Sequence, residues 1–162
     1  MLYLVQKGLL DIPVLYLSRH IVRTKPDYYR LLQAVRERHD DPAVWQEWVH
    51  YLLTAVESTA TQTLGTVADI KAALMDYKHR IRAEYKFYSQ DLINNLFTHP
   101  YTKIDFVERD LKVSRLTATK YLDALSAGGF VQKVKLGRSN YYINLALNAI
   151  LTRAEMIEGA QG

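Results

Sequence analysis

The segment from Ser89 to Asn144 constrains the fold most, because three short helical stretches are followed directly by two β-rich stretches. The helical stretches are SQDLINNLFTHP, IDFVERDL and RLTATKYLDALSA, which are separated by a proline and a short turn, KVS. The runs FVQKVKL and NYYIN lie on either side of GRS, which predicts a β-hairpin. Three helices followed by a hairpin is the order of a winged helix-turn-helix, and we expect that fold here.

The third of these helices carries a polar face that suits DNA. We expect Ser114 to cap it and the glycine pair after Ala127 to end it. Ala118, Leu122 and Leu125 share one face, which is expected to pack on the second helix. The N-terminal part of such a helix normally enters the major groove, while a hairpin wing can touch phosphates. The predicted DNA contacts are Ser114, Arg115, Thr117, Thr119, Lys120, Lys133, Lys135, Arg138 and Asn140.

The net charge of the chain is concentrated in this same region. The 162 residues carry a formal charge of +4 at pH 7. From His99 to Asn144 there are eight Lys or Arg and four Asp or Glu, so this segment holds the whole excess and the remainder is neutral. A positive segment suits an anionic partner, and we expect double-stranded DNA.

The first part of the chain is predicted to be helical throughout. Pro13 can open a helix that runs to Arg23, Pro26 starts another, and Pro42 after Asp41 starts a third. We therefore expect a mainly α chain in three parts. These are a helical bundle at residues 1–88, a winged helix-turn-helix with a small β-hairpin at 89–146, and a C-terminal helix or tail at 147–162.

An apolar stripe with alternating spacings of 3 and 4 precedes the winged helix-turn-helix. Such a heptad pattern is typical of helices that pack along a seam. One interpretation is that it packs on the protein's own helices, and the other is a homodimer contact. The predicted dimer seam consists of Val67, Ile70, Leu74, Tyr77 and Ile81, preceded in the stripe by Ala60 and Thr63.

Motifs for catalysis, metal binding or membrane insertion do not occur in the sequence. The chain has no cysteine, and its five histidines do not stand at ligand spacings. It has neither a glycine-rich phosphate loop nor a Gly-x-Ser-x-Gly elbow, and no apolar run approaches the roughly 18 residues that span a bilayer. We therefore expect a cytoplasmic protein that is not an enzyme, with no cofactor and no metal.

Two long stretches resemble the part of bacterial Fic-family proteins that follows their catalytic motif. The specific segments are PVLYLS, the YY..L pair in PDYYRLL, and LFTHPYTKI, and the resemblance covers nearly the whole chain. It implies helices of a Fic domain followed by the winged-helix region that one subgroup carries. Fic proteins transfer AMP or related groups to hydroxyls of target proteins through a His-Pro-Phe-x-(Asp/Glu)-Gly-Asn-Gly-Arg motif. That motif is absent: HPYTKIDF at His99 begins like it but lacks the glycines, asparagine and arginine.

The resemblance leads us to expect that Met1 is an internal start or a truncation of a longer protein. The apolar faces at Leu2–Leu10 and Pro13–Arg23 would then lack their cover, which favours a homodimer. Three functions remain open at this stage. The first is a DNA-binding regulatory module of a Fic protein. The second is a protein-interaction or dimerisation module of a Fic AMP-transferase, which would present a protein target, and the third is a fragment that retains nucleotide binding.

Overall fold

The protein was studied as a computed structural model that describes residues 2–11, 15–137 and 139–159. The chain divides into two compact units. One comprises residues 1–67 together with 155–162, and the other comprises residues 68–154. No helix in the described ranges is both long and apolar enough to cross a membrane.

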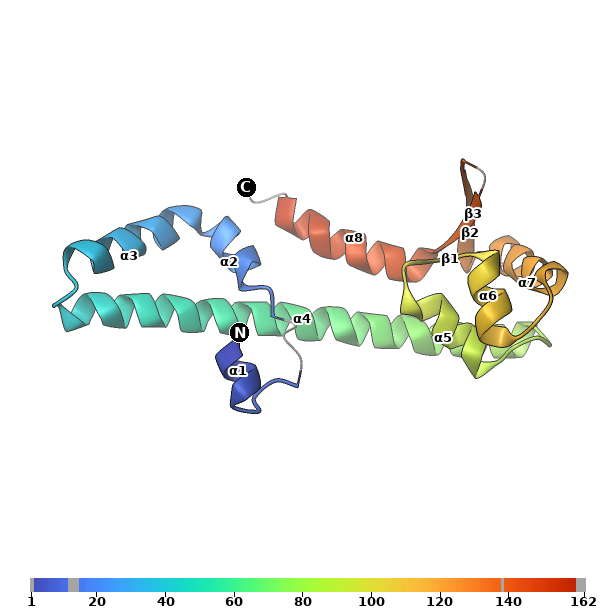
Figure 1. The fold of residues 1–162 in the computed structure, drawn as a ribbon, viewed down its shortest axis with the longest axis horizontal. Coiled ribbons are helices and arrows are strands. Elements are labelled where there is room, and N and C mark those ends of the chain that lie inside the picture. The colour runs from blue at the N-terminus through green and yellow to red at the C-terminus, as the bar shows by residue number, and fades with distance from the viewer. Residues whose placement is uncertain (1, 12–14, 138, 160–162) are drawn as a thin grey trace. The chain divides into compact units, whose positions relative to one another are not determined.

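The first unit is built from helices. It contains α1 (Leu2–Gln6), α2 (Leu17–Arg23), α3 (Lys25–Glu37) and the first part of α4 (Pro42–Glu84), shown in Figure 1. The start expected at Pro13 is wrong, since the helix that ends at Arg23 begins at Leu17, after Tyr16. Pro13 itself and Val14 lie outside the described residues. The helix expected at Pro42 does begin there and continues through Gly65 to Glu84 without a break.

Aromatic rings hold α3 against α4 in this unit. The Tyr28 ring lies 5.5 Å from Trp48, and the rings of Trp48 and Tyr51 are stacked at 6.0 Å. The Tyr51 hydroxyl also shares a 2.7 Å hydrogen bond with the Thr24 hydroxyl, at the junction of α2 and α3. Leu31 of α3 and Val44 of α4 are buried. Aromatic packing near the start of α3 therefore joins this helix to α4.

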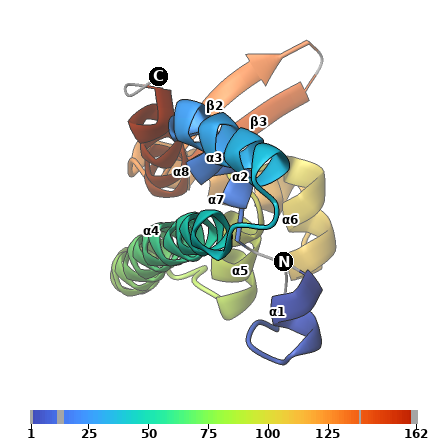
Figure 2. The same cartoon turned by 90° about the vertical axis from the view of Figure 1, so that its left-hand side faces the viewer.

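The second unit confirms the predicted winged helix-turn-helix. After the end of α4 come α5 (Gln90–Thr98), β1 (Tyr101–Thr102), α6 (Ile104–Leu111) and α7 (Arg115–Ala127). The hairpin of β2 (Val131–Leu136) and β3 (Ser139–Asn144) follows, and α8 (Leu145–Gly159) comes last. Figure 2 shows the two hairpin strands side by side. The short strand β1 was not predicted; it pairs with β3, which gives an antiparallel sheet in the order β1-β3-β2.

Local chemistry explains where these elements begin and end. The Ser89 side chain accepts a hydrogen bond from the Leu92 amide and caps α5, and Ser114 caps α7 as predicted. The turn between α6 and α7 needs a left-handed residue, and Lys112 adopts that conformation with φ 54°. Gly137 supplies positive φ at the tip of the hairpin.

A single apolar core holds the helices, the hairpin and the end of α4 together. Its fully buried members include Ile81 from α4, Leu92 and Leu96 from α5, Val107 from α6, Leu122 from α7 and Phe130 before β2. Burial of one such side chain contributes about 1.5–3 kcal/mol. Because α5, α6, α7, β2 and β3 all contribute to this core, the base of the hairpin packs on the three helices.

Candidate nucleic-acid interface

The orientation of α7 is set by its buried face. Ala118, Leu122 and Leu125 are completely buried against the rest of the unit, as the spacing predicted. At about 100° per residue, the opposite side of the helix presents Leu116 and Lys120. Leu116 is 67% exposed and Lys120 is also exposed. This outward face is the part of the helix that another molecule can reach.

Leu116 was not among the predicted contacts because it is apolar. Its signal in the sequence is its helical position, four residues before Lys120 and two residues before the buried Ala118. In helices that enter the major groove, an apolar side chain at this position can contact the methyl group of thymine. The outward face of α7 therefore combines an apolar group with a cation.

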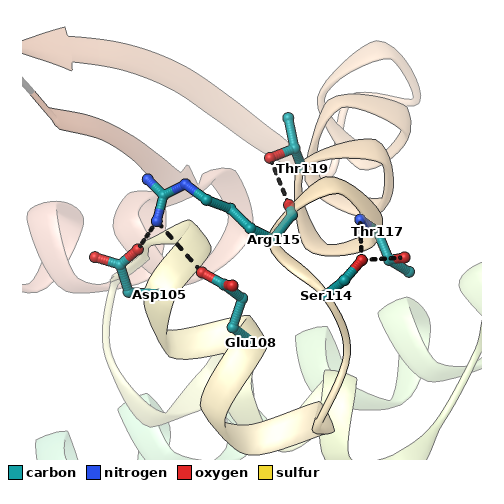
Figure 3. A network of polar contacts seen from close by, with 6 residues as sticks. All are labelled: Asp105, Glu108, Ser114, Arg115, Thr117 and Thr119. Carbon is teal, nitrogen blue, oxygen red and sulfur yellow. Dashed lines mark hydrogen bonds and ion pairs between the residues drawn. The ribbon is translucent and has the colours of Figure 1, made fainter.

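The hydroxyl groups at the start of α7 bond within the helix (Figure 3). The Ser114 hydroxyl accepts the Thr117 amide at 3.3 Å and lies 2.9 Å from the Thr117 hydroxyl. The Thr119 hydroxyl donates to the Arg115 carbonyl oxygen at 2.8 Å. These predicted contact residues thus stabilise the first turns of α7 through hydrogen bonds. Only the lone pairs and protons that these bonds do not use are available to a ligand.

Arg115 is held by two acids of α6. Its Nη1 donates to Asp105 Oδ1 at 2.5 Å and lies 3.4 Å from Glu108 Oε2, as Figure 3 shows. The group of three thus has one cation and two anions, and its formal charge is negative. Arg115 therefore adds no excess positive potential here. Its hydrogen bonds to these two acids use Nη1, so the N–H groups of Nη2 and Nε can still donate to the acceptors of a guanine edge.

Lys133 is also held by an acid, in this case Asp123 of α7. Lys133 Nζ lies 2.8 Å from Asp123 Oδ1, and Tyr142 Oη donates to the same oxygen at 2.9 Å. The hydrogen bond from Lys133 holds the pKa of Asp123 below its ordinary value, and the hydrogen bond to Asp123 raises the pKa of Lys133. Both groups are therefore charged at neutral pH, and the lysine charge is matched inside the protein.

Three lysines in the winged helix-turn-helix are exposed and free of ion pairs in the described part of the chain. Lys112 stands in the turn before α7, Lys120 on the outward face of α7, and Lys135 on β2. Asn140 is half-buried and lines a hollow of about 80 Å³ together with Lys103, Asp105, Arg115 and Ser139. Arg138, the remaining predicted contact, lies outside the described residues.

The predicted dimer seam is divided by the fold. Tyr77 and Ile81 are buried in the core of the winged-helix unit, and Leu74 packs against that core. These three residues therefore pack within the chain, as the first interpretation of the stripe expects. Ile70 is partly buried, and Val67 is 55% exposed. Tyr77 and Ile81 are therefore not available to a second chain while the unit is folded.

No group of three or more His, Asp or Glu side chains that could hold a metal occurs in the ranges that the structure describes. The carboxylates nearest the interface are each paired with a cation, Asp105 with Arg115 and Asp123 with Lys133.

Comparison with known proteins finds a family model that is similar to this region. Residues 74–147 match the family model described as the C-terminal domain of SoFic-like protein adenylyltransferase. For this segment, the match confirms the predicted resemblance to the C-terminal region of Fic proteins. A solved structure, a MarR family protein from Bacillus stearothermophilus, is 14% identical over 64% of this chain and 76% of that chain, with a TM-score of 0.33. The fold described above rests on the elements of this chain and not on that similarity.

Proposed function

We propose that this chain is a non-catalytic, DNA-binding regulatory module of a Fic-type adenylyltransferase. The observation that supports it most directly is the outward face of α7, where Leu116 and Lys120 are exposed side by side in helical register. Lys112 precedes this face and Lys135 lies on the neighbouring hairpin, so three unpaired lysines accompany the helix. A helix with this composition fits the major groove, and the lysines fit the phosphates beside it.

The proposal has a quantitative consequence for salt. Each phosphate that a lysine neutralises contributes about 0.9 to the slope of log affinity against log salt. Three contacts then give a slope of about −2.7, so the affinity falls about 40-fold between about 50 and 200 mM salt. Arg115 and Lys133 add little to this slope, because their charges are already matched by Asp105 and Asp123.

Fluorescence anisotropy of labelled duplex DNA, measured across this salt range, tests the proposal. Lys120→Ala is expected to weaken binding and to lower the slope by about 0.9. Lys71→Ala is the matched control, since Lys71 is an exposed lysine of the same unit that lies on α4. Circular dichroism shows whether each variant is folded. A folded wild-type chain that does not bind duplex DNA at the lowest salt contradicts the proposal.

A protein-interaction module is the second candidate, and exposed leucines favour it. Leu116 on α7 and Leu136 near the hairpin tip are both largely exposed. A docking surface for a protein target of the adenylyltransferase would use such groups, and its affinity would depend much less on salt. Under this candidate Leu116→Asp abolishes capture of a protein partner, whereas Lys120→Ala has little effect.

A further inference from the structure

The hairpin carries two lysines on the same face of the same strand, but their surroundings differ. Lys133 is directly opposite Tyr142 in the antiparallel register, and Lys135 is opposite Asn140. Residues two apart on a strand point the same way, so both side chains lie on the face that carries the buried Tyr142. Lys133 is bonded to Asp123 of α7, whereas Lys135 has no ion pair in the described part of the chain.

Asp123 connects three elements through one oxygen atom. Its Oδ1 accepts Lys133 of β2 at 2.8 Å and Tyr142 of β3 at 2.9 Å, while Asp123 itself stands on α7. The Tyr142 ring is completely buried and its hydroxyl is directed at the carboxylate, which fixes the acceptor in place. The Lys133 ammonium also lies 5.5 Å from the centre of the Tyr142 ring.

The pair of Lys133 and Asp123 is too exposed to contribute much to folding. Their side chains are 40% and 46% exposed, and solvent screens an ion pair at such a surface. A contact of this kind has its main effect on geometry, because it restricts how the hairpin can lie relative to α7. The spacing of wing and helix is what a duplex must match when both contact it.

We infer that Asp123 and Lys133 are positioning residues that clamp the hairpin wing to the recognition helix, and that Lys135, not Lys133, is the phosphate contact of this strand. The DNA part of this inference rests on the proposed function. The clamp itself does not, since it concerns contacts within the protein. Lys133 was predicted to contact DNA. Under this inference it affects DNA binding only by positioning the hairpin wing.

The clamp is tested without DNA by measuring a distance across it. The chain has no native cysteine, so Ala127→Cys and Leu136→Cys allow nitroxide labels at the end of α7 and near the hairpin tip. Electron-spin resonance is expected to give a narrow distance distribution in the parent and a broad one after Lys133→Met. Lys133→Arg should restore the narrow distribution, and Lys135→Met, the matched control, should leave it unchanged. An unchanged distribution after Lys133→Met overturns the clamp.

The assignment of the phosphate contact is tested with duplex DNA on the unlabelled proteins. Lys135→Met should lower the salt slope by about 0.9, and Lys133→Met should reduce the affinity several-fold at every salt concentration with the slope unchanged. A reduced slope after Lys133→Met overturns the assignment. If the wild-type chain binds no DNA, the proposed function and this assignment fail together, while the distance measurement still decides whether the clamp exists.

Discussion

The hydroxyl of Tyr77 donates a 2.7 Å hydrogen bond to the carbonyl oxygen of Phe130, which joins the long helix α4 to the residue that precedes the hairpin. The same hydroxyl accepts the Ala146 amide at 3.2 Å, at the start of α8. Burial raises the pKa of Tyr77, so the hydroxyl remains protonated and able to donate at neutral pH. One side chain thus satisfies two main-chain groups that lie 53 and 69 residues away in the sequence.

Tyr77→Phe is therefore expected to lower the free energy of unfolding by about 1–3 kcal/mol. It removes the partner of the Ala146 amide and one of the two hydrogen bonds to the Phe130 carbonyl, which keeps the Leu145 amide at 3.2 Å. Urea unfolding followed by circular dichroism measures the change. Tyr101→Phe is the control, since Tyr101 is partly exposed on the edge strand β1, and it should cost less than about 0.5 kcal/mol. Equal effects of the two variants would contradict the role of the Tyr77 hydroxyl.

The stability of the winged-helix unit should fall in acid, and Asp110 is one cause. Its hydrogen bonds with Arg109 and then Asn95 hold its pKa below the ordinary value for aspartate of about 3.9. The unfolded chain consequently binds protons first as the pH falls. The stabilisation by Asp110 is complete above the ordinary pKa and is lost as the pH falls through the lowered one. Asp123 acts in the same direction because Lys133 lowers its pKa, but its contribution is smaller, since solvent screens this exposed pair.

The check is the urea midpoint of wild type and of Asp110→Asn/Asp123→Asn, measured between about pH 5 and pH 3. The wild type should lose stability more steeply across this range than the double variant, and each single variant should fall between them. A double variant that loses stability as steeply as the wild type would show that these two carboxylates are not responsible.

The sequence predicted the parts of the candidate interface that depend on neighbours along one helix. The cap at Ser114 follows from the residue type, and the buried face of α7 follows from spacings of three and four residues. Both are found. The pairing of Arg115 with Asp105 does not follow, because these residues are ten apart and meet only across the turn at Lys112. Helical spacing predicts which side chains are buried, but it does not predict which residues pack against them.

The same limit explains the apolar stripe on α4 and the strand β1. A heptad spacing is satisfied equally by a second chain or by the protein's own core. For Tyr77 and Ile81 the cover comes from residues more than ten positions further along the chain, including Leu92 and Phe130. The strand β1 has only two residues, and it exists because β3 offers an open edge to pair with. The local sequence pattern predicts neither the residues that cover the stripe nor the pairing of β1 with β3.

Lys112 is strained, and relieving the strain should stabilise the protein. It is the only residue other than glycine with positive φ in the described part of the chain. Glycine takes this conformation without steric cost, so Lys112→Gly should raise the free energy of unfolding by about 0.5–1 kcal/mol. Lys120→Gly, inside α7, should instead lower it by about 1 kcal/mol. Thermal unfolding of both variants measures the contrast, and destabilisation by Lys112→Gly would contradict the strain.

Leu116→Ala separates a binding role from a structural one. The side chain is largely exposed, so its truncation should change the free energy of unfolding by less than about 0.5 kcal/mol. Leu122→Ala, on the buried face of the same helix, should cost about 2–5 kcal/mol. If Leu116 contacts a thymine methyl group, the alanine variant also binds selected duplexes several-fold more weakly, with an unchanged salt slope because no charge is lost. DNA selected from a random pool with the wild-type chain provides the duplexes for the anisotropy measurement. Undiminished affinity in a folded Leu116→Ala variant would remove Leu116 from the DNA interface and direct the search for its partner toward proteins.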